Sequence, residues 1–133
     1  MAEPKKLLET ALFGLLDAAL SCAVYNTRAA GSTFNYVVFQ AAGGDDDWYL
    51  MKKRGHVYDY QVVAVHTDRS AALDLNATLD GAMAGAMAGT LSVSGYGVVS
   101  VARVDPVDYT QVLEDGQMLH YVGGVYRIEL EEV

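Results

Sequence analysis

Three consecutive carboxylates, Asp45-Asp46-Asp47, are the residues whose type best suits metal chemistry. Carboxylate oxygens are the ligands that Mg²⁺ and Ca²⁺ prefer, so a small metal-dependent enzyme is one hypothesis for this chain. Three neighbouring residues rarely converge on one ion, however, and the ligand spacing of an EF-hand loop is absent. The pattern therefore favours a solvated acidic loop, and we predict no metal site.

The other reactive side chains are scattered along the sequence. His56, His66 and His120 stand in no metal-ligand spacing, and the single Cys22 excludes both a zinc knuckle and an intrachain disulfide. Residues 95–97 read Gly-Tyr-Gly, as a dinucleotide-binding loop begins, but the third glycine is missing and a β-branched run follows. No nucleophile elbow and no P-loop occurs. We therefore predict no catalytic and no cofactor-binding residues, and a protein that is not an enzyme.

The composition is that of one folded domain with an acidic surface. The chain has 133 residues, 52% of them apolar, and a formal net charge of −8. Its acidity does not suit nucleic-acid binding, which needs clustered Lys and Arg. No run reaches the about 18 apolar residues that a membrane span needs. The Leu-rich N-terminal segment resembles a signal peptide, but Glu9 and Asp17 interrupt it, and we interpret it as a helix.

Two segments have helical periodicity. Pro4 suits the first position of a helix, because its missing N–H would have no partner there anyway. Asp68 suits the cap of a second helix, since its carboxylate can accept from the first-turn N–H groups, and Gly89 suits the end of that helix. Apolar residues recur at helical spacing in both segments: Leu8, Leu12, Leu15 and Ala19 in the first, and Ala72, Leu75, Leu79, Met83 and Ala86 in the second.

Runs rich in Val and Tyr predict six strands around these helices. The predicted strands cover 36–40, 48–51, 56–67, 91–104, 107–113 and 117–131. A polar loop is expected at Ala41–Asp47, a turn at Asp105-Pro106, and a two-residue hairpin turn at Asp115-Gly116. The order α-β-β-β-α-β-β-β indicates a single α+β domain over 1–133, with one mixed or antiparallel β-sheet packed by two helices.

Two features of the helices suggest contacts with other subunits. Phe13 falls in the middle of the polar side of the first helix, where a large aromatic residue is out of place in a monomer. Gly81 and Gly85 fall opposite the apolar stripe of the second helix and leave its outer face small and nearly uncharged. Each glycine costs a helix about 1 kcal/mol relative to alanine. This face therefore indicates either a close-contact surface for a neighbour or a locally frayed helix end.

A set of residues in a fixed order and spacing runs through nearly the whole chain. In chain order these are Val24-Tyr25, Phe34-Asn35-Tyr36-Val37-Val38, Trp48, Arg54-Gly55-His56, Val65-His66-Thr67-Asp68-Arg69, Ser70-Ala71-Ala72-Leu73, Tyr109, Asp115-Gly116, His120 and Arg127-Ile128-Glu129-Leu130-Glu131-Glu132. With this order the chain resembles the tail terminator and tail completion proteins of long-tailed bacteriophages (siphophages). It departs from them at Asn35, where family members often carry proline.

The resemblance implies a structural virion protein that forms a homohexameric ring. The ring caps the finished tail tube, ends tail polymerisation and offers the head–tail connector protein a joining surface. The protein is then expected at the head-proximal end of the tail, and in the host cytoplasm during assembly, without membrane contact. DNA passes through the lumen without specific binding. A neck or connector protein on the head side of the same region is the alternative interpretation.

We expect subunit or tail-tube contacts on both helices and on the segment between the first two predicted strands. The residues expected in these contacts are Phe13, Asp45, Asp46, Asp47, Trp48, Tyr49, Lys52, Lys53, Arg54, Gly81 and Gly85. The loop 41–51, together with 52–54, is expected to be mobile in the free subunit and to contact a neighbour or the tube, because Trp48 and Tyr49 would not stay exposed in the particle.

The ring lumen is expected to be net negative, since each subunit carries an excess of carboxylates. The candidate lining residues are Asp45–Asp47 together with Glu129, Glu131 and Glu132, with Arg127 partly offsetting the latter. DNA that passes an acidic wall keeps its own counterions, so no binding energy accumulates to stall it. The alternative is that these acids lie on the outer rim and aid solubility.

Overall fold

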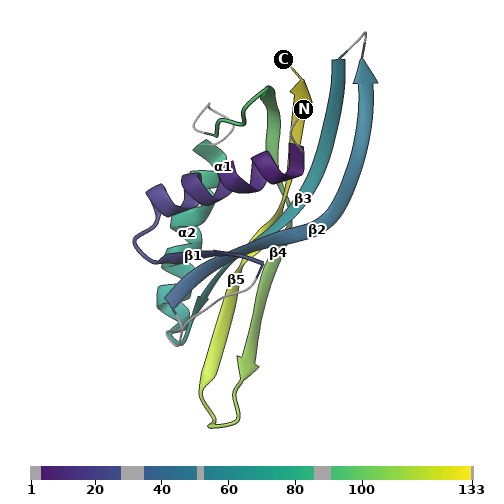
Figure 1. Cartoon of the computed structure of the whole chain (residues 1–133). Coiled ribbons are helices and arrows are strands. Elements are labelled where there is room, and N and C mark those ends of the chain that lie inside the picture. The colour runs from purple at the N-terminus through teal and green to yellow at the C-terminus, as the bar shows by residue number, and fades with distance from the viewer. Residues whose placement is uncertain (1–3, 28–34, 51–52, 86–90, 133) are drawn as a thin grey trace.

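The computed structural model describes residues 4–27, 35–50, 53–85 and 91–132, and the side chains of 43–54 lie outside that description. Two helices and five strands follow one another along the chain (Figure 1). The elements are α1 (Pro4–Ala19), β1 (Ala23–Asn26), β2 (Asn35–Leu50), β3 (Lys53–His66), α2 (Arg69–Gly85), β4 (Tyr96–Val112) and β5 (Met118–Glu132).

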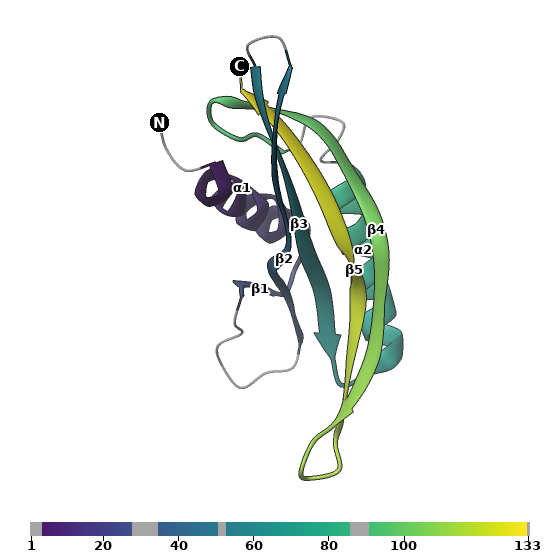
Figure 2. The same ribbon diagram turned by 90° about the vertical axis from the view of Figure 1, so that its right-hand side faces the viewer.

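The five strands form one mixed sheet in the order β1-β2-β3-β5-β4. β1 pairs with β2 in parallel, and every other neighbouring pair is antiparallel. The sheet is strongly curved, and both helices pack on the same face of it (Figures 1 and 2). The hairpins β2–β3 and β4–β5 extend past the helices at opposite ends of the sheet. The predicted α+β class, with one sheet packed by two helices, is confirmed.

Helix α1 faces the sheet with three leucines spaced four residues apart. Leu8, Leu12 and Leu16 are fully buried, and each contributes about 2 kcal/mol through removal of its side chain from water. The helix begins at Pro4, as predicted. The predicted stripe is wrong at its end, because Leu15 is only half-buried and Ala19 is exposed. The buried leucines lie four residues apart throughout and therefore share one face of the helix. Leu15 and Ala19 lie to the side of that face.

Helix α2 starts at the predicted cap. The Asp68 carboxylate accepts from the Ser70 N–H at 3.2 Å, and the Asp68 carbonyl accepts from the Ala72 N–H at 2.9 Å. Ala72, Leu79 and Met83 are buried against the sheet, and Leu75 is half-buried beside them. The predicted end at Gly89 and the last stripe residue, Ala86, lie outside the described residues.

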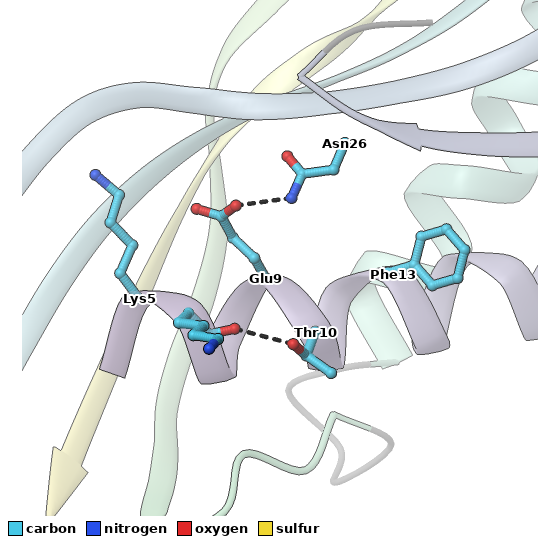
Figure 3. Close-up of a pocket in the computed structure, with 6 residues that line it drawn as sticks. Lys5, Glu9, Thr10, Phe13 and Asn26 are labelled. Atoms are coloured by element: carbon cyan, nitrogen blue, oxygen red, sulfur yellow. Dashed lines mark hydrogen bonds between the residues drawn. The ribbon is translucent and has the colours of Figure 1, made fainter. Parts of the chain in front are cut away.

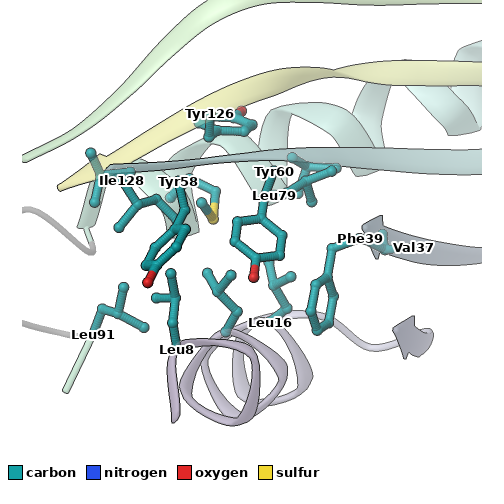
Figure 4. Packing of buried hydrophobic residues seen from close by; sticks show 14 of the residues in the cluster. Leu8, Leu16, Val37, Phe39, Tyr58, Tyr60, Leu79, Leu91, Tyr126 and Ile128 are labelled. Atoms are coloured by element: carbon teal, nitrogen blue, oxygen red, sulfur yellow. The ribbon is translucent and has the colours of Figure 1, made fainter. Parts of the chain in front are cut away.

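The core lies between the helices and the covered face of the sheet (Figure 4). Tyr58 and Tyr60 point from β3 toward α1, where they meet the leucines of the buried row. Phe39 of β2 packs beside Tyr60, with ring centroids 6.4 Å apart. Tyr126, Ile128 and Leu130 continue this layer from β5 at every second residue.

The predicted loop Ala41–Asp47 is wrong, because this segment is part of strand β2. The backbone pairs with β3 from Asn35 to Leu50, so the two strands predicted at 36–40 and 48–51 are one. The register shifts between Ala41 and Gly43 and again between Gly43 and Asp46. β-bulges take up extra residues without ending a strand, and the Gly-Gly-Asp composition that indicates a loop is also what bulges accept.

The predicted turn at Asp105-Pro106 is also wrong, because β4 runs through it. Asp105 pairs with Val125 and Pro106 with Gly124, next to a register shift between Arg103 and Asp105. β4 is an edge strand, and a strand at the edge tolerates a proline whose missing N–H would face away from the sheet. β1 is a strand that the sequence analysis missed. The observed order is therefore α-β-β-β-α-β-β, one strand fewer than predicted.

Two tight turns contain glycines with positive φ, at Gly95 and at the predicted Gly116. Gly95 has a φ of 82°, and the Tyr96 N–H donates to the Val93 carbonyl at 3.1 Å. In the β4–β5 hairpin Gly116 has a φ of 84°, and the Leu113 N–H donates to the Gln117 carbonyl at 2.8 Å. The hairpin loop is therefore the three residues 114–116, one more than predicted, with glycine in the left-handed position.

Candidate assembly surfaces

A hollow of about 520 Å³ lies along the outer side of α1, next to β1 (Figure 3). We call it the α1 hollow. Its lining residues are Lys5, Lys6, Glu9, Thr10, Phe13 and Asn26. Figure 3 shows Glu9 between Lys5 and Phe13 along the helix, with Asn26 of β1 facing it. The hollow thus has a basic end toward the start of α1 and an aromatic end at Phe13.

Hydrogen bonds from two strands fix Glu9 in the middle of the α1 hollow. One carboxylate oxygen accepts from the Asn26 side-chain amide at 2.7 Å, and the other accepts from the Tyr60 hydroxyl at 2.8 Å. Tyr60 is fully buried, so its hydroxyl needs this acceptor. The ammonium of Lys5 lies 5.9 Å from the centroid of the Tyr58 ring. The hollow is therefore preformed in the subunit.

Phe13 lies with 43% of its surface exposed on the polar side of α1. The helical spacing predicts this position for Phe13, and Phe13 is not one of the buried core residues. Its contact with another subunit stays a prediction.

The predicted glycine positions lie on the other helix. Gly81 is exposed on α2, and a Cβ there would meet nothing within 4 Å. Gly85 is half-buried and is the last described residue of α2. Leu73, on the same helix, is 43% exposed. Gly81 therefore lies on the exposed face of α2, and a partner for this face stays a prediction.

The remaining predicted contact residues lie on the β2–β3 hairpin. In the backbone register Asp46 is opposite Val57, Asp47 opposite His56, Trp48 opposite Gly55, Tyr49 opposite Arg54 and Leu50 opposite Lys53. The structure thus places Trp48 and Tyr49 alongside Lys53 and Arg54 on paired strands. Lys52 lies outside the described residues, and so do the side chains of Asp45, Asp46 and Asp47.

The tip of the β4–β5 hairpin is a further exposed surface, which was not predicted from the sequence. Val112 and Met118 are opposite each other in the register and are 64% and 49% exposed. Glu114 and Asp115 are exposed in the loop between them. This exposed apolar pair on a projecting hairpin makes the tip a candidate contact surface. A β-strand that keeps apolar residues to its last position before a turn is the sequence signal that could have found it.

A tyrosine-rich patch lies on the sheet face away from the helices. Tyr109 and Tyr121 stack with ring centroids 4.5 Å apart, and Tyr25 meets Tyr36 edge-on at 5.6 Å. These rings border a second buried cluster of Val63, Val65 and Leu119. Burial, and secondly the neighbouring tyrosines, raise the pKa values of Tyr36 and Tyr121. The tyrosine rings of the patch give this face of the sheet an apolar layer, and their hydroxyl groups are polar.

Ion pairs connect the helices and strands at the surface. The Arg69 guanidinium donates to both Asp108 carboxylate oxygens at 2.9 and 2.8 Å, which ties the start of α2 to β4 and lowers the pKa of Asp108. Arg127 pairs with Asp59 across β5 and β3 at 3.0 Å. The Arg69–Asp108 pair is about half exposed on both sides, and such solvated pairs contribute little to stability. In the second pair the Asp59 carboxylate is largely buried, and Arg127 is about half exposed.

A partly buried network of hydrogen bonds and an ion pair joins β5, α2 and β4. The Tyr126 hydroxyl donates to the Asp80 carboxylate at 2.6 Å, and Arg103 lies 3.6 Å from the same oxygen. Arg103 also donates to the Gly123 carbonyl. Burial, and secondly the hydrogen bond to Asp80, raise the pKa of Tyr126 well above its ordinary value. The network holds a phenol in its neutral form and has a structural role.

Tyr126→Phe is expected to make the protein less sensitive to alkaline pH. A raised phenol pKa stabilises the fold fully below the unfolded-state value of about 10, and this contribution is lost as the pH rises toward the folded-state pKa. The variant should lose about 1 kcal/mol at neutral pH, for one hydrogen bond, and decline less steeply above pH 10. Urea unfolding from pH 8 to 11 measures both; parallel wild-type and variant curves would contradict the assignment.

Each of the three histidines makes a ring stack or a hydrogen-bond contact with a nearby group. His56 is buried and stacks on Tyr58, with ring centroids 6.0 Å apart. His66 accepts from the Asp68 N–H at 2.9 Å, and His120 lies 3.0 Å from the Thr110 hydroxyl. His66 and His120, far apart in sequence, are opposite each other on β3 and β5. Within the described residues, no group of three His, Cys, Asp or Glu is placed to hold a metal ion.

None of the described helical segments is long and apolar enough to cross a membrane. No protein-family model matches the chain, and no curated protein sequence matches it. A solved chain of similar structure belongs to the "Virion of native gene transfer agent (GTA) particle". The two superpose with a TM-score of 0.69 at 20% identity, over 98% of this chain and 99% of the other. At this identity the similarity shows a shared fold, and it extends over the full length of both chains.

Proposed function

We propose that this protein is a structural virion component that forms a ring at the head-proximal end of a phage-like tail. The observation that carries the proposal is the full-length similarity of fold to a chain from a gene transfer agent virion. The resemblance of the sequence to siphophage tail terminator proteins supports the same conclusion independently of the fold. In this role the ring caps the tail tube, ends its polymerisation and presents a surface to the head–tail connector.

The distribution of exposed apolar residues supports a ring of identical subunits. Phe13 lies on α1, and Val112 with Met118 lies at the tip of the β4–β5 hairpin, on a different part of the molecule. When one subunit uses two different surfaces to contact its neighbours, the contacts are head-to-tail, and such contacts generate rings if the rotation closes. A hexameric ring is the closed form that the family resemblance implies.

The net charge of −8 supports a lumen through which DNA passes without binding. Glu129, Glu131 and Glu132 are half-buried on β5, and Asp45–Asp47 lie on the β2–β3 hairpin. Charges act on DNA only within about 8 Å at physiological salt, so only residues that line the channel matter.

Replacing Asp45, Asp46 and Asp47 together by lysine is expected to leave ring assembly intact and to slow DNA release, because the new cations would bind phosphates. DNA ejection from complemented particles measures this. Ejection at the wild-type rate would place these acids on the outer rim.

The role is tested with purified protein, tail tubes and DNA-filled heads. The mass of the free protein over a concentration series reports self-association, and electron microscopy shows whether the protein binds the end of isolated tubes. Binding to tube ends with arrest of tube growth is the expected result. Binding to filled heads alone would assign the protein to the neck, and the absence of both would overturn the proposal.

A further inference from the structure

We infer that the tip of the β4–β5 hairpin of one subunit docks into the α1 hollow of the next copy of this chain. The inference rests on the proposed ring and specifies which two surfaces make its head-to-tail contact. The hairpin tip consists of residues 112–118, and the α1 hollow is the site defined above.

The hairpin tip has the form of a rigid apolar wedge with an acidic end. Val112 and Met118 face each other across the two strands and are the most exposed apolar pair of the hairpin. Asp115 accepts from the Gln117 N–H at 2.9 Å, and the Leu113–Gln117 backbone bond closes the loop. Because the turn is already ordered in the subunit, docking has a low entropic cost.

The α1 hollow has room for side chains of the tip, and it has one apolar end at Phe13. Its volume of about 520 Å³ is within the range of roughly 300–1,000 Å³ found for ligand pockets. Phe13 supplies a half-exposed ring at one end, which Val112 or Met118 would cover. Glu9 is already held by Asn26 and Tyr60, so the floor does not have to rearrange.

Charge complementarity orients the tip in the hollow. Lys5 and Lys6 line the hollow. Lys5 lies at the end away from Phe13 (Figure 3). In a chain with a net charge of −8, the Lys5-Lys6 pair is one of two runs of adjacent basic residues, the other being Lys52-Lys53-Arg54. Glu114 and Asp115 at the hairpin tip supply two carboxylates. Complementary charges across an interface fix its register and disfavour wrong partners, here a second acidic surface.

The two surfaces cannot meet within one subunit. The hairpin extends beyond the helices at one end of the sheet, whereas α1 packs across the sheet nearer the other end (Figure 1). When the tip of one subunit enters the hollow of its neighbour, the hollow of the first subunit can receive the tip of another copy. The same contact then repeats around the assembly.

A reciprocal charge exchange tests the pairing. Lys6→Glu and Glu114→Lys alone are each expected to weaken association at least about tenfold, because each puts like charges in contact. The double variant is expected to recover association to within about threefold of wild type. An equimolar mixture of the two single variants should also assemble, since alternating subunits restore an opposite-charge pair at every contact. The control is Lys6→Glu with Asp17→Lys, which has the same net charge but changes an exposed α1 residue outside the hollow.

Sedimentation velocity over a concentration series measures association, and thermal unfolding verifies that each variant folds. If wild type associates and the double variant does not recover, the docking inference is wrong while the proposed ring stands. If the control recovers as well as the exchange, net charge explains the effect and the inference is also wrong. If wild type is monomeric at every concentration and does not bind tail tubes, the ring proposal and the inference are both overturned.

Discussion

Gly123→Ala is expected to leave almost no folded protein. A Cβ at this position would lie 2.0 Å from the Val62 carbonyl oxygen and 2.7 Å from the Val63 Cα. Both are backbone atoms of β3, which pairs with β5 at this point, so neither can move without breaking the ladder. We expect a loss of more than about 4 kcal/mol, out of the roughly 5–15 kcal/mol by which ordinary domains are stable.

The matched control is Gly81→Ala, the same substitution in an open place. A Cβ at Gly81 meets nothing within 4 Å, and the residue lies inside α2. This variant should gain up to about 1 kcal/mol from helix propensity. Soluble yield and thermal unfolding by circular dichroism measure both. A Gly123→Ala protein that melts within a few degrees of wild type would show that β3 and β5 do not approach this closely.

Phe13→Asp is expected to abolish assembly while the subunit stays folded. Phe13 is 43% exposed and lies outside the buried core, so its removal should change the free energy of unfolding by no more than about 0.5 kcal/mol. In an interface, an aromatic residue of this kind is a candidate hot spot, whose loss costs at least about 2 kcal/mol. That corresponds to a weakening of roughly 30-fold, before the added cost of burying a carboxylate.

Val99→Asp is the matched control, because Val99 has the same exposed fraction, lies on β4 and belongs to none of the predicted contact surfaces. Sedimentation and tail-tube binding compare the two variants with wild type. Equal loss in both would mean that any new surface carboxylate disrupts the ring, and unfolding of Phe13→Asp would mean that Phe13 supports the core.

The helices were predictable because their signals are local. Pro4 and Asp68 act through backbone groups within one turn, and the leucines of α1 repeat at a single period. The error at Leu15 and Ala19 has a tertiary cause. Which side of an apolar stripe is buried deepest depends on how the helix lies on the sheet, and that is not encoded in the spacing alone.

The two wrong predictions in the sheet have a common physical reason. The composition around Gly43 and at Pro106 disfavours an isolated strand, so both places read as chain reversals. Each instead lies next to a long partner strand, and pairing along that partner continues through a bulge. β1 was missed because four residues carry little pattern, and only the parallel contact with β2 makes them a strand.

The candidate surfaces could be predicted only where the exposure of a side chain depends on a single helix or strand. Phe13 can be placed by the phase of α1, and its exposure is as expected. The α1 hollow also needs Asn26 from β1 and the hydrogen bond between Tyr60 and Glu9, which depend on the tertiary fold. The hairpin tip needs the register that puts Val112 opposite Met118.

The place of β5 in the sheet has a consequence for how the protein is made. β5 lies between β3 and β4 but follows both in the chain. While the ribosome is still adding its 15 residues, β3 and β4 have no common neighbour, and the edge of β3 that pairs with β5 is open. Open strand edges of this kind are the surfaces that aggregate or are held by chaperones. Completion of the core therefore waits for synthesis of β5, and a nascent chain that stalls before it does not become a competent subunit.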